Sequence, residues 1–478
     1  MSADFAPFER RMREAGLPEL AIRSFHAAYE KLASGSQGLL EEREIEPVEE
    51  LPELGELEAC RAAGAEALGQ TVVVKLNGGL GTSMGMTRAK SLLPVKDGLR
   101  FLDVIARQLL WLQGRHGCRV PLVLMNSFRT RRDSLAALRP YGKLSGPLPP
   151  DFLQHKVPRI RAEDLAPVRW PERPELEWCP PGHGDLYTAL VSSGMLEAML
   201  EAGFRTAFVS NADNLGAVLD LAILGWFRRS GAPFLMEVKR RSATDRKGGH
   251  LARLRDGRLA LREIAQCPAA ERARFEDVAR WGWFNTNNLW IDLPALAALL
   301  RERDGLLELP LIRNEKSVDP RDPHSPRVIQ LETAMGAAIS AFPGARALRV
   351  PAERFAPVKT TADLLRVRSD VYVLAEDQRV LPAPGCRPGA LAIELDPAFY
   401  QRVDAFEERF PEGPPSLREC RSLRIQGDVR FGAGVVLRGA VRLRGPRQIP
   451  DGSVIECAEE PLQPGEGTGS GAAAQRSR

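Results

Sequence analysis

The stretch of sequence that decides the fold is Val72-Val73-Val74-Lys75-Leu76, which runs directly into Asn77-Gly78-Gly79-Leu80-Gly81-Thr82-Ser83-Met84-Gly85. The first five residues are typical of a buried strand. The glycines that follow lack Cβ atoms and tolerate positive φ, so backbone N–H groups there can close around phosphate oxygens. A loop at the end of a central strand lies at the ligand crevice of an open α/β sheet. We therefore predict a nucleotide-phosphate site at residues 77–85.

Two better-known phosphate motifs do not fit this loop. No Gly-Lys-Ser/Thr closes it, as a P-loop requires, and Met84 stands where G-x-G-x-x-G needs its third glycine. The alternative is a tight turn that only needs flexible residues. Four glycines in eight residues directly after a strand favour the phosphate site over that turn.

Around the loop, short strand-like runs alternate with helical stretches, which is typical of βαβ units and a mostly parallel sheet. The runs are 72–74, 101–112, 120–125, 186–201, 206–210 and 219–227. We predict a Rossmann-like α/β domain over residues 61–375. Apolar residues at helical spacing, among them Met12, Phe25 and Leu32, predict a helical N-terminal segment within residues 1–60.

Beyond residue 375 the pattern changes to strands and turns. Leu423, Val429, Val435 and Val441 lie six residues apart with glycines between them. This period predicts a left-handed parallel β-helix within residues 376–458, and a simple β-meander is the alternative. Residues 459–478 are rich in Gly, Ala, Ser and Pro, and we expect a disordered tail there.

Length and composition limit the class of protein. The chain has 478 residues, 44% of them hydrophobic and 27% charged, so we expect several soluble globular domains. The net charge of +4 comes from intermixed acids and bases, and predicts no nucleic-acid partner. The seven cysteines form no C-x-x-C pair, residues 1–13 do not resemble a signal peptide, and no apolar run has transmembrane length. We expect a cytoplasmic protein without a membrane partner.

Several blocks in this order resemble the UDP-glucose pyrophosphorylase family across roughly residues 70 to 370. They are Lys75–Gly85 with Lys90-Ser91-Leu92, Met125–Phe128, Gln154–Arg159, Cys179–Asp185, Ser210–Leu215, Phe284–Trp290 and Pro357–Thr361. The resemblance implies a nucleotidyltransferase that converts UTP and glucose 1-phosphate to UDP-glucose and pyrophosphate. The sugar phosphate would attack the α-phosphorus of UTP in line, so catalysis would rest on positioning and charge neutralisation.

The resemblance also implies roles for individual residues at the triphosphate and the base. Lys90 and Lys359 would neutralise the phosphates, and Asp213, after a strand-like run, would hold Mg²⁺. Gln154 offers a paired donor and acceptor that match the edge of uracil. The other expected nucleotide-binding residues are Gly78, Gly79, Leu80, Gly81, Thr82, Met125 and Gly182.

The sugar 1-phosphate would be bound by a second set of polar residues. Asn285 and Asn287 alternate by two, so in an extended segment they share one face. The full set that the resemblance implies is His183, Asn211, Gly249, Glu263, Asn285 and Asn287, with His183 near the sugar's phosphate.

The chain departs from the family pattern after the loop. Where many members have Cys-Lys-Gly-Pro, it has Met86-Thr87-Arg88-Ala89. We hypothesise that Arg88 supplies the missing positive charge at the triphosphate and count it among the catalytic candidates. The alternatives are a UDP-N-acetylhexosamine or broad-specificity UDP-sugar pyrophosphorylase, and a nucleotide-sensing protein without turnover. We expect a monomer or a small homo-oligomer.

Overall fold

The computed structural model describes residues 4–35, 38–319, 322 and 324–456. These residues form two compact units. The larger unit contains the chain up to Thr82, then Met86–Lys359 and Leu374–Leu381. The smaller unit contains Ser83–Gly85, Thr360–Val373 and the chain from Pro382. The tail predicted at residues 459–478 lies outside the described residues.

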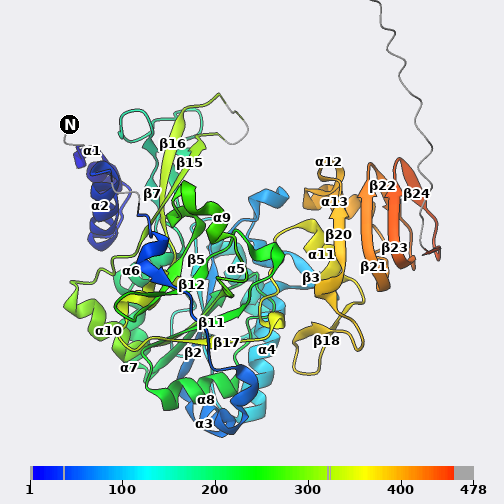
Figure 1. Cartoon of the computed structure of the whole chain (residues 1–478), viewed down its shortest axis with the longest axis horizontal. Helices are drawn as coiled ribbons and strands as arrows, with labels where there is room; N and C mark the ends of the chain where they lie inside the picture. Colours follow the sequence, from blue (N-terminus) through cyan, green and yellow to red (C-terminus); the bar gives the residue numbers. More distant parts are fainter. Residues whose placement is uncertain (1–3, 36–37, 320–321, 323, 457–478) are drawn as a thin grey trace, which may run out of the picture. The chain divides into compact units, whose positions relative to one another are not determined.

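A ten-stranded sheet forms the centre of the larger unit (Figure 1). Its main path runs in the order β1 (Ile45–Glu46), β12 (His250–Leu254), β14 (Trp283–Asp292), β10 (Thr206–Asn211), β2 (Thr71–Asn77), β5 (Leu122–Asn126) and β6 (Asp151–Leu153). Strands β10, β2, β5 and β6 pair in parallel, whereas β14 is antiparallel to β10. Off this path lie β11 (Phe234–Arg240), β13 (Leu259–Arg262) and β17 (Arg346–Arg349). The predicted α/β class with a parallel centre is confirmed.

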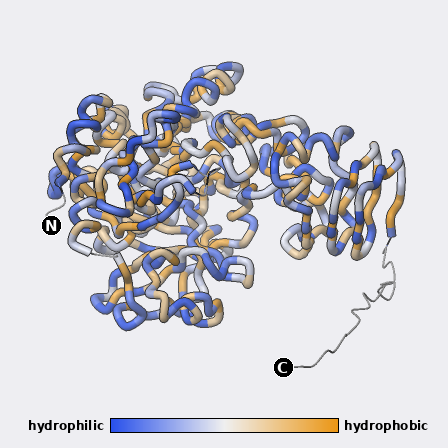
Figure 2. Tube along the Cα trace, turned by 90° about the horizontal axis from the view of Figure 1, so that it is seen from above, coloured by the Kyte–Doolittle hydropathy of each residue, from blue (hydrophilic) through white to orange (hydrophobic). Residues whose placement is uncertain are grey.

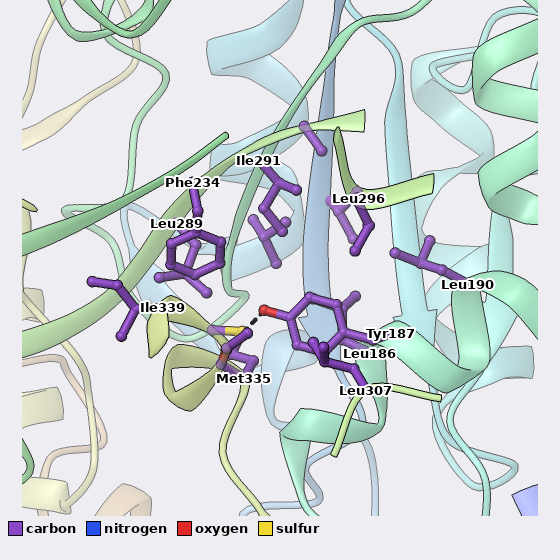
Figure 3. Packing of buried hydrophobic residues seen from close by; sticks show 14 of the residues in the cluster. Leu186, Tyr187, Leu190, Phe234, Leu289, Ile291, Leu296, Leu307, Met335 and Ile339 are labelled. Atoms are coloured by element: carbon purple, nitrogen blue, oxygen red, sulfur yellow. Dashed lines mark hydrogen bonds between the residues drawn. The ribbon is translucent and has the colours of Figure 1, made fainter. Parts of the chain in front are cut away.

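Strand β2 is buried on both faces, as its run of valines predicts. Val72 and Val74 pack into one core with α6 (Leu186–Ser192), α7 (Met195–Glu201) and α10 (Leu293–Glu302). Val73 packs into the opposite core with α4 (Phe101–His116) and α8 (Leu221–Ser230), with α3 (Arg61–Ala67) at its edge. Figure 3 shows part of the first core, where the Tyr187 hydroxyl donates to the Met335 carbonyl at 2.7 Å.

Helices α3 and α8 approach so closely that their backbones touch. A Cβ on Gly225 would overlap the Cys60 carbonyl oxygen, and a Cβ on Gly64 would overlap that of Leu221. Both obstacles are backbone atoms, which cannot move aside as a side chain can.

We therefore expect Gly225→Ala to destabilise the larger unit by about 1–3 kcal/mol or more. The matched control is Gly114→Ala in α4, where nothing lies within 4 Å of the added Cβ. That change should stabilise the protein by about 0.5–1 kcal/mol, because alanine favours a helix more than glycine. Urea unfolding of both variants measures the difference, and equal midpoints would contradict the close approach.

The N-terminal helices α1 (Ala6–Glu14) and α2 (Glu19–Ala33) confirm the predicted helical segment. They share a core with β15 (Leu311–Ser317), β16 (Arg327–Thr333) and β8 (Ile160–Arg161), which form a three-stranded sheet. Further along, β1 pairs with β12 at the end of the central sheet's main path. The described residues among the first 60 thus belong to the larger unit.

The smaller unit contains parallel strands in two sheets. One is β20 (Ala392–Leu395), β21 (Ser416–Gln426), β23 (Val436–Arg444) and β25 (Val454–Glu456), and the other is β22 (Val429–Phe431) with β24 (Arg447–Ile449). Leu423 pairs with Val441, three six-residue repeats later. All four residues of the predicted six-residue series are buried, and Figure 2 shows hydrophobic and hydrophilic stretches alternating along these strands. Parallel pairing contradicts the β-meander alternative.

The two units interleave around the predicted boundary at residue 375: Thr360–Val373 belongs to the smaller unit, Leu374–Leu381 to the larger one, and the chain from Pro382 again to the smaller one. Helix α11 (Thr361–Arg368) already belongs to the smaller unit, and the Thr360 hydroxyl caps it by accepting from the Asp363 N–H at 3.2 Å. The remaining elements are α5 (Arg131–Leu138), α9 (Arg272–Phe275), α12 (Pro397–Tyr400), α13 (Val403–Arg409), β3 (Pro94–Lys96), β4 (Leu99–Arg100), β7 (Val157–Pro158), β9 (Trp178–Cys179), β18 (Tyr372–Leu374) and β19 (Val380–Pro382). Within the described part of the chain, no helix has both the length and the apolar character needed to cross a bilayer.

Candidate active site

A cavity of about 310 Å³ lies at the carboxyl ends of β2, β5 and β10, where the sequence predicts the ligand crevice. Nine of the predicted site residues line it: Gly78, Gly79, Lys90, Met125, Gln154, Gly182, His183, Asn211 and Asp213. The structure thus brings together residues from separate sequence blocks around one space.

Polar side chains of β5 and the residues after it hydrogen-bond to the start of the glycine loop. The Asn77 amide donates to the Asn126 side-chain oxygen at 2.7 Å and to the Ser134 hydroxyl at 2.8 Å. The Ser127 hydroxyl donates to the Gly78 carbonyl at 3.1 Å. These bonds fix the loop on the neighbouring strand β5, so its outer edge stays available to a ligand.

Lys90 and Asp213 form the charged part of the cavity. The Lys90 ammonium donates to the Asp213 carboxylate at 2.6 Å, and the two side chains are 14% and 27% exposed. The Lys90 N–H also donates to the Gly79 carbonyl at 3.1 Å, which ties the lysine to the loop. A partly exposed pair of this kind adds little stability, and its exposure leaves both charges within reach of a phosphorylated ligand.

Gln154 lies directly against the loop, since a Cβ on Gly78 would overlap the Gln154 Oε1 atom. Its amide nitrogen donates to the Gly182 carbonyl at 3.0 Å. Gly182 has φ +83°, and a Cβ there would lie 2.5 Å from the Thr333 carbonyl oxygen. Only glycine fits this position, and it holds the Gln154 amide in one orientation.

Behind Gln154 lies an array of serine, histidine and aspartate. The Asp185 carboxylate accepts from the His155 N–H at 2.7 Å and bonds the His155 ring at 2.8 Å, and the ring bonds the Ser192 hydroxyl at 3.0 Å. The spacing matches a hydrolase triad, but Ser192 ends α6, and the N–H groups of the two following residues bond the Ala189 and Val191 carbonyls. These two N–H groups are thus occupied and cannot act as oxyanion donors beside the serine. The array instead fixes His155, the residue next to Gln154.

His183 is a neutral hydrogen-bond donor at the cavity. Its Nδ1 accepts from the Met335 N–H at 3.0 Å, which assigns the ring proton to Nε2. Burial lowers the pKa of His183 to about 4. The ring therefore stays uncharged near neutral pH and can donate to a phosphate oxygen.

This lowered pKa predicts a specific loss of stability in acid. In the unfolded chain an imidazole titrates near pH 6.5, so unfolding becomes coupled to proton uptake as the pH falls from about 6.5 towards 4. We expect His183→Gln, which still offers an acceptor to Met335, to lose less stability over that range, by on the order of 1–2 kcal/mol. Urea unfolding of both proteins at pH 7.5 and 4.5 tests this. Parallel losses in the two proteins would contradict it.

The predicted sugar-binding residues form a second cluster beside the cavity. The Asn285 N–H donates to the Gly249 carbonyl at 3.2 Å, and the Asn285 side chain donates to that of Asn287 at 2.9 Å. A Cβ on Gly249 would lie 2.5 Å from the Glu263 carboxylate. Burial raises the pKa of Glu263, and the nearby Lys359 ammonium opposes this rise. Gly249, Glu263, Asn285, Asn287 and Lys359 thus lie together.

A main-chain contact joins the two clusters. The Val358 N–H donates to the Asp213 carbonyl at 3.3 Å, so the segment that carries Lys359 runs beside the turn that carries Asp213. Four predicted residues belong neither to the lining of the cavity nor to the second cluster: Leu80, Gly81, Thr82 and Arg88. Thr82 and Arg88 are exposed. A Cβ on Gly81 would lie 3.3 Å from the Lys90 side chain.

Several residues at the site were not predicted from the sequence. Ser91 lines the cavity, and its buried hydroxyl has no hydrogen-bond partner within the described residues. Asn126, Ser127 and Asp185 support the loop and Gln154. All four residues lie inside the sequence blocks that resemble the family, and this position was the one sign in the sequence that they belong to the site. Their supporting roles depend on contacts between strands that a linear pattern does not contain.

Comparisons with known proteins agree with this arrangement. The family described as UTP--glucose-1-phosphate uridylyltransferase matches residues 22–438. The enzyme of that name from Solanum tuberosum is 42% identical over 394 residues, which cover 81% of this chain and 80% of that protein. The one from Saccharomyces cerevisiae is 41% identical and covers 81% and 77%.

Solved structures give the same result. A mutant of UDP-glucose pyrophosphorylase from Leishmania major in complex with UDP-glucose is 43% identical with a TM-score of 0.87, and the match covers 95% of this chain and 98% of that one. UDP-glucose phosphorylase from Trypanosoma brucei is 44% identical with a TM-score of 0.85 and covers 94% and 97%. With the family match over most of its length and the shared fold, the chain belongs to the UTP--glucose-1-phosphate uridylyltransferase family of nucleotidyltransferases.

Proposed function

We propose that this protein is a uridylyltransferase that converts UTP and glucose 1-phosphate to UDP-glucose and pyrophosphate. The observation that carries the proposal is the Lys90–Asp213 pair in the cavity bordered by the glycine loop and Gln154. A cation and a carboxylate in this cavity would suit a triphosphate with its metal ion, and the transfer needs no nucleophilic side chain. A phosphate oxygen of the sugar 1-phosphate attacks the α-phosphorus of UTP. The bond from that phosphorus to the bridging oxygen of pyrophosphate breaks, and pyrophosphate leaves with the electron pair.

In this reaction the protein's own groups bind, orient and neutralise charge. The backbone N–H groups of Gly78 and Gly79 would hold phosphate oxygens, and the Lys90 ammonium would stabilise the charge on the leaving pyrophosphate. The Nε2–H of His183 would donate to the phosphate of the sugar. Lys359, beside the Asp213 turn, would supply a second cation.

Mg²⁺ fits this site together with the nucleotide. Among the described residues, no three His, Cys, Asp or Glu side chains gather into a metal cluster. Mg²⁺ commonly takes one or two protein carboxylates and completes its shell with phosphate oxygens and water. Asp213 would hold it with the oxygen that Lys90 does not occupy. Bound there, the ion would neutralise charge on the triphosphate.

Specificity would come from the two polar clusters. Gln154 would present its amide to the edge of uracil, with Met125 against the ring. Glu263, Asn285 and Asn287 would bind sugar hydroxyls, supported by the main chain of Gly249. We also propose that the parallel coils of the smaller unit form a left-handed β-helix, on the basis of the six-residue period and the parallel register.

A panel of substrates tests the proposal. Purified protein with Mg²⁺ is mixed with UTP, ATP, CTP or GTP and with the 1-phosphates of glucose, galactose or N-acetylglucosamine, and pyrophosphate release is measured. We expect the highest kcat/KM with UTP and glucose 1-phosphate. A preference for N-acetylglucosamine 1-phosphate or comparable rates with several sugars would favour a UDP-N-acetylhexosamine or broad-specificity enzyme. No pyrophosphate release with any pair would contradict the proposal.

A further inference from the structure

A second cavity lies on the opposite face of the sheet from the Val72 and Val74 core. It has a volume of about 420 Å³, within the range of about 300–1,000 Å³ that is usual for small-molecule sites. Its walls come from β2, α4, β10 and the segment from Ala217 to Leu221. We call it the Lys75 cavity, after the lysine of β2 that lines it.

Lys75 is a buried cation inside this cavity. The residue is 2% exposed, and its ammonium donates to the Ser210 hydroxyl and to the Ala217 carbonyl, both at 2.7 Å. Among the described residues these are the two hydrogen-bond partners of Lys75, and an ammonium carries three donors, so one donor remains for a ligand. The Phe208 ring lies 5.5 Å from the ammonium, and apolar side chains such as Ile105 and Leu109 line the same cavity.

Lys75 differs from the neighbouring Arg354 in having no carboxylate among its hydrogen-bond partners in the described part of the chain. Arg354, 8% exposed, also lines it and is paired with the fully buried Glu237 through two hydrogen bonds, at 2.6 and 2.7 Å. Glu237 thus already compensates Arg354, whereas the partners of Lys75 within the described residues are a hydroxyl and a carbonyl, both neutral. The remaining charged or titratable groups in the lining are Arg61, Arg115, His116, Asp220, Asp377 and Arg379. Two of these arginines have carboxylate partners, since Arg61 pairs with Glu58 at 2.7 Å and Arg379 with Asp377 at 2.5 Å.

We propose that the Lys75 cavity binds a small organic monocarboxylate, with its carboxylate on the Lys75 ammonium and its apolar body against Ile105, Leu109 and Phe208. One uncompensated buried charge and one remaining ammonium donor match a monoanion. A phosphate dianion would bring a second charge and more acceptors than the buried groups can satisfy. No residue of the lining belongs to the candidate active site, so this is a separate site in the same unit.

Acid should favour binding. Burial lowers the pKa of Lys75 to about 7. The positive charge of Arg354 lowers this pKa further, whereas the negative charge of Glu237 raises it. A carboxylate binds the charged ammonium, so above this pKa the protein must take up a proton when the ligand binds. The affinity should therefore fall by up to about tenfold per pH unit above pH 7. A neutral ligand of the same size should not respond to pH in this way.

Calorimetric titration of the full chain with hexanoate tests the proposal, with hexan-1-ol as the matched neutral probe and saturating UTP present in a parallel series. At pH 6.5 we expect hexanoate to bind at least about tenfold more tightly than hexan-1-ol. Saturating UTP should leave the affinity for hexanoate unchanged. Between pH 7 and 8.5 the affinity for hexanoate should fall at least about fivefold. Equal affinities for the two probes, displacement by UTP, or no change with pH would overturn the proposal.

Two variants locate the site. Lys75→Met should reduce hexanoate affinity to that of the alcohol and leave alcohol binding in place, because the apolar walls remain. Leu112→Trp changes a half-buried side chain of the lining and should block both probes without touching the buried lysine. If Lys75→Met fails to fold, Leu112→Trp and the pH series still test whether hexanoate binds in the Lys75 cavity. Hexanoate binding that survives Leu112→Trp at full strength would place the ligand elsewhere.

Discussion

Lys90→Met is expected to lower kcat for UDP-glucose formation by about 10²–10³-fold, the usual cost of removing one pre-positioned group that stabilises transition-state charge. Methionine keeps most of the length of the side chain, so the loss isolates the charge. The ammonium lies 2.6 Å from Asp213, and the backbone of Lys90 is tied to Gly79. Both contacts fix it beside the glycine loop before any substrate arrives. Pyrophosphate release at saturating UTP and glucose 1-phosphate measures the effect.

Two further lysine and arginine variants complete this experiment. Lys143 is exposed and lies outside the site cavity, so Lys143→Met should leave kcat unchanged and controls for the loss of one positive charge. Arg88→Met tests whether Arg88 replaces the cation missing from the family's loop. A kcat loss above about tenfold would support that hypothesis. If Lys90→Met kept more than a tenth of the wild-type kcat, the assignment of Lys90 as a catalytic residue would be wrong.

Much of the fold follows from local patterns in the sequence. The valine run of β2 predicts a strand buried on both sides, and the six-residue series from Leu423 to Val441 predicts parallel coils. The edge strand β1 has only two residues, Ile45 and Glu46, and its pairing with Leu254 and Arg253 is a long-range contact. No local pattern encodes such a partner. The assignment of Thr360–Val373 to the smaller unit and of Leu374–Leu381 to the larger one likewise depends on packing, because α11 resembles the other helices in composition.

In the candidate site, too, some residues could be predicted from local sequence patterns and others depend on long-range contacts. Lys90, Gln154 and Asp213 could be predicted because they stand at fixed places in sequence blocks, and the sheet topology brings the ends of β2, β5 and β10 together. The supports could not be predicted in this way. Asp185 holds His155 from 30 residues away, and Ser127, after β5, reaches the Gly78 carbonyl after β2. Such contacts arise only once the strands are in register.

A buried polar network joins the Asp213 turn to the segment that carries Lys359. The Asn214 side chain donates to that of Asn288 and to the Arg354 carbonyl, and accepts from the Ala356 N–H at 2.9 Å. Asn288 donates to Glu237 at 3.1 Å, and Trp290 donates to the other oxygen of Glu237 at 2.9 Å. Glu237 is fully buried and also binds both Nε and Nη2 of Arg354. Its carboxylate is thus the centre of the network.

Glu237→Leu should destabilise the larger unit by about 3–5 kcal/mol, because it leaves the Arg354 guanidinium buried without a counter-charge. Adding Arg354→Met removes that charge and should recover part of the loss, since a buried ion pair can be replaced by apolar side chains at little cost. The rest should remain, because the Asn288 and Trp290 donors lose Glu237 as their acceptor in both variants. Urea unfolding of both single variants and the double variant measures this coupling.

Activity should not recover with stability in the double variant. The pair fixes the carbonyl of Arg354, on which Asn214 and Asn288 both converge, and so sets the distance between the Asp213 turn and Lys359. We therefore expect the folded double variant to keep kcat about tenfold or more below that of the wild type, because small displacements of charged groups weaken transition-state stabilisation. A double variant with both wild-type stability and wild-type kcat would mean that the ion pair has no positioning role. A stable double variant with a low kcat would mean that the ion pair mainly positions the Asp213 turn relative to Lys359 and contributes little to stability.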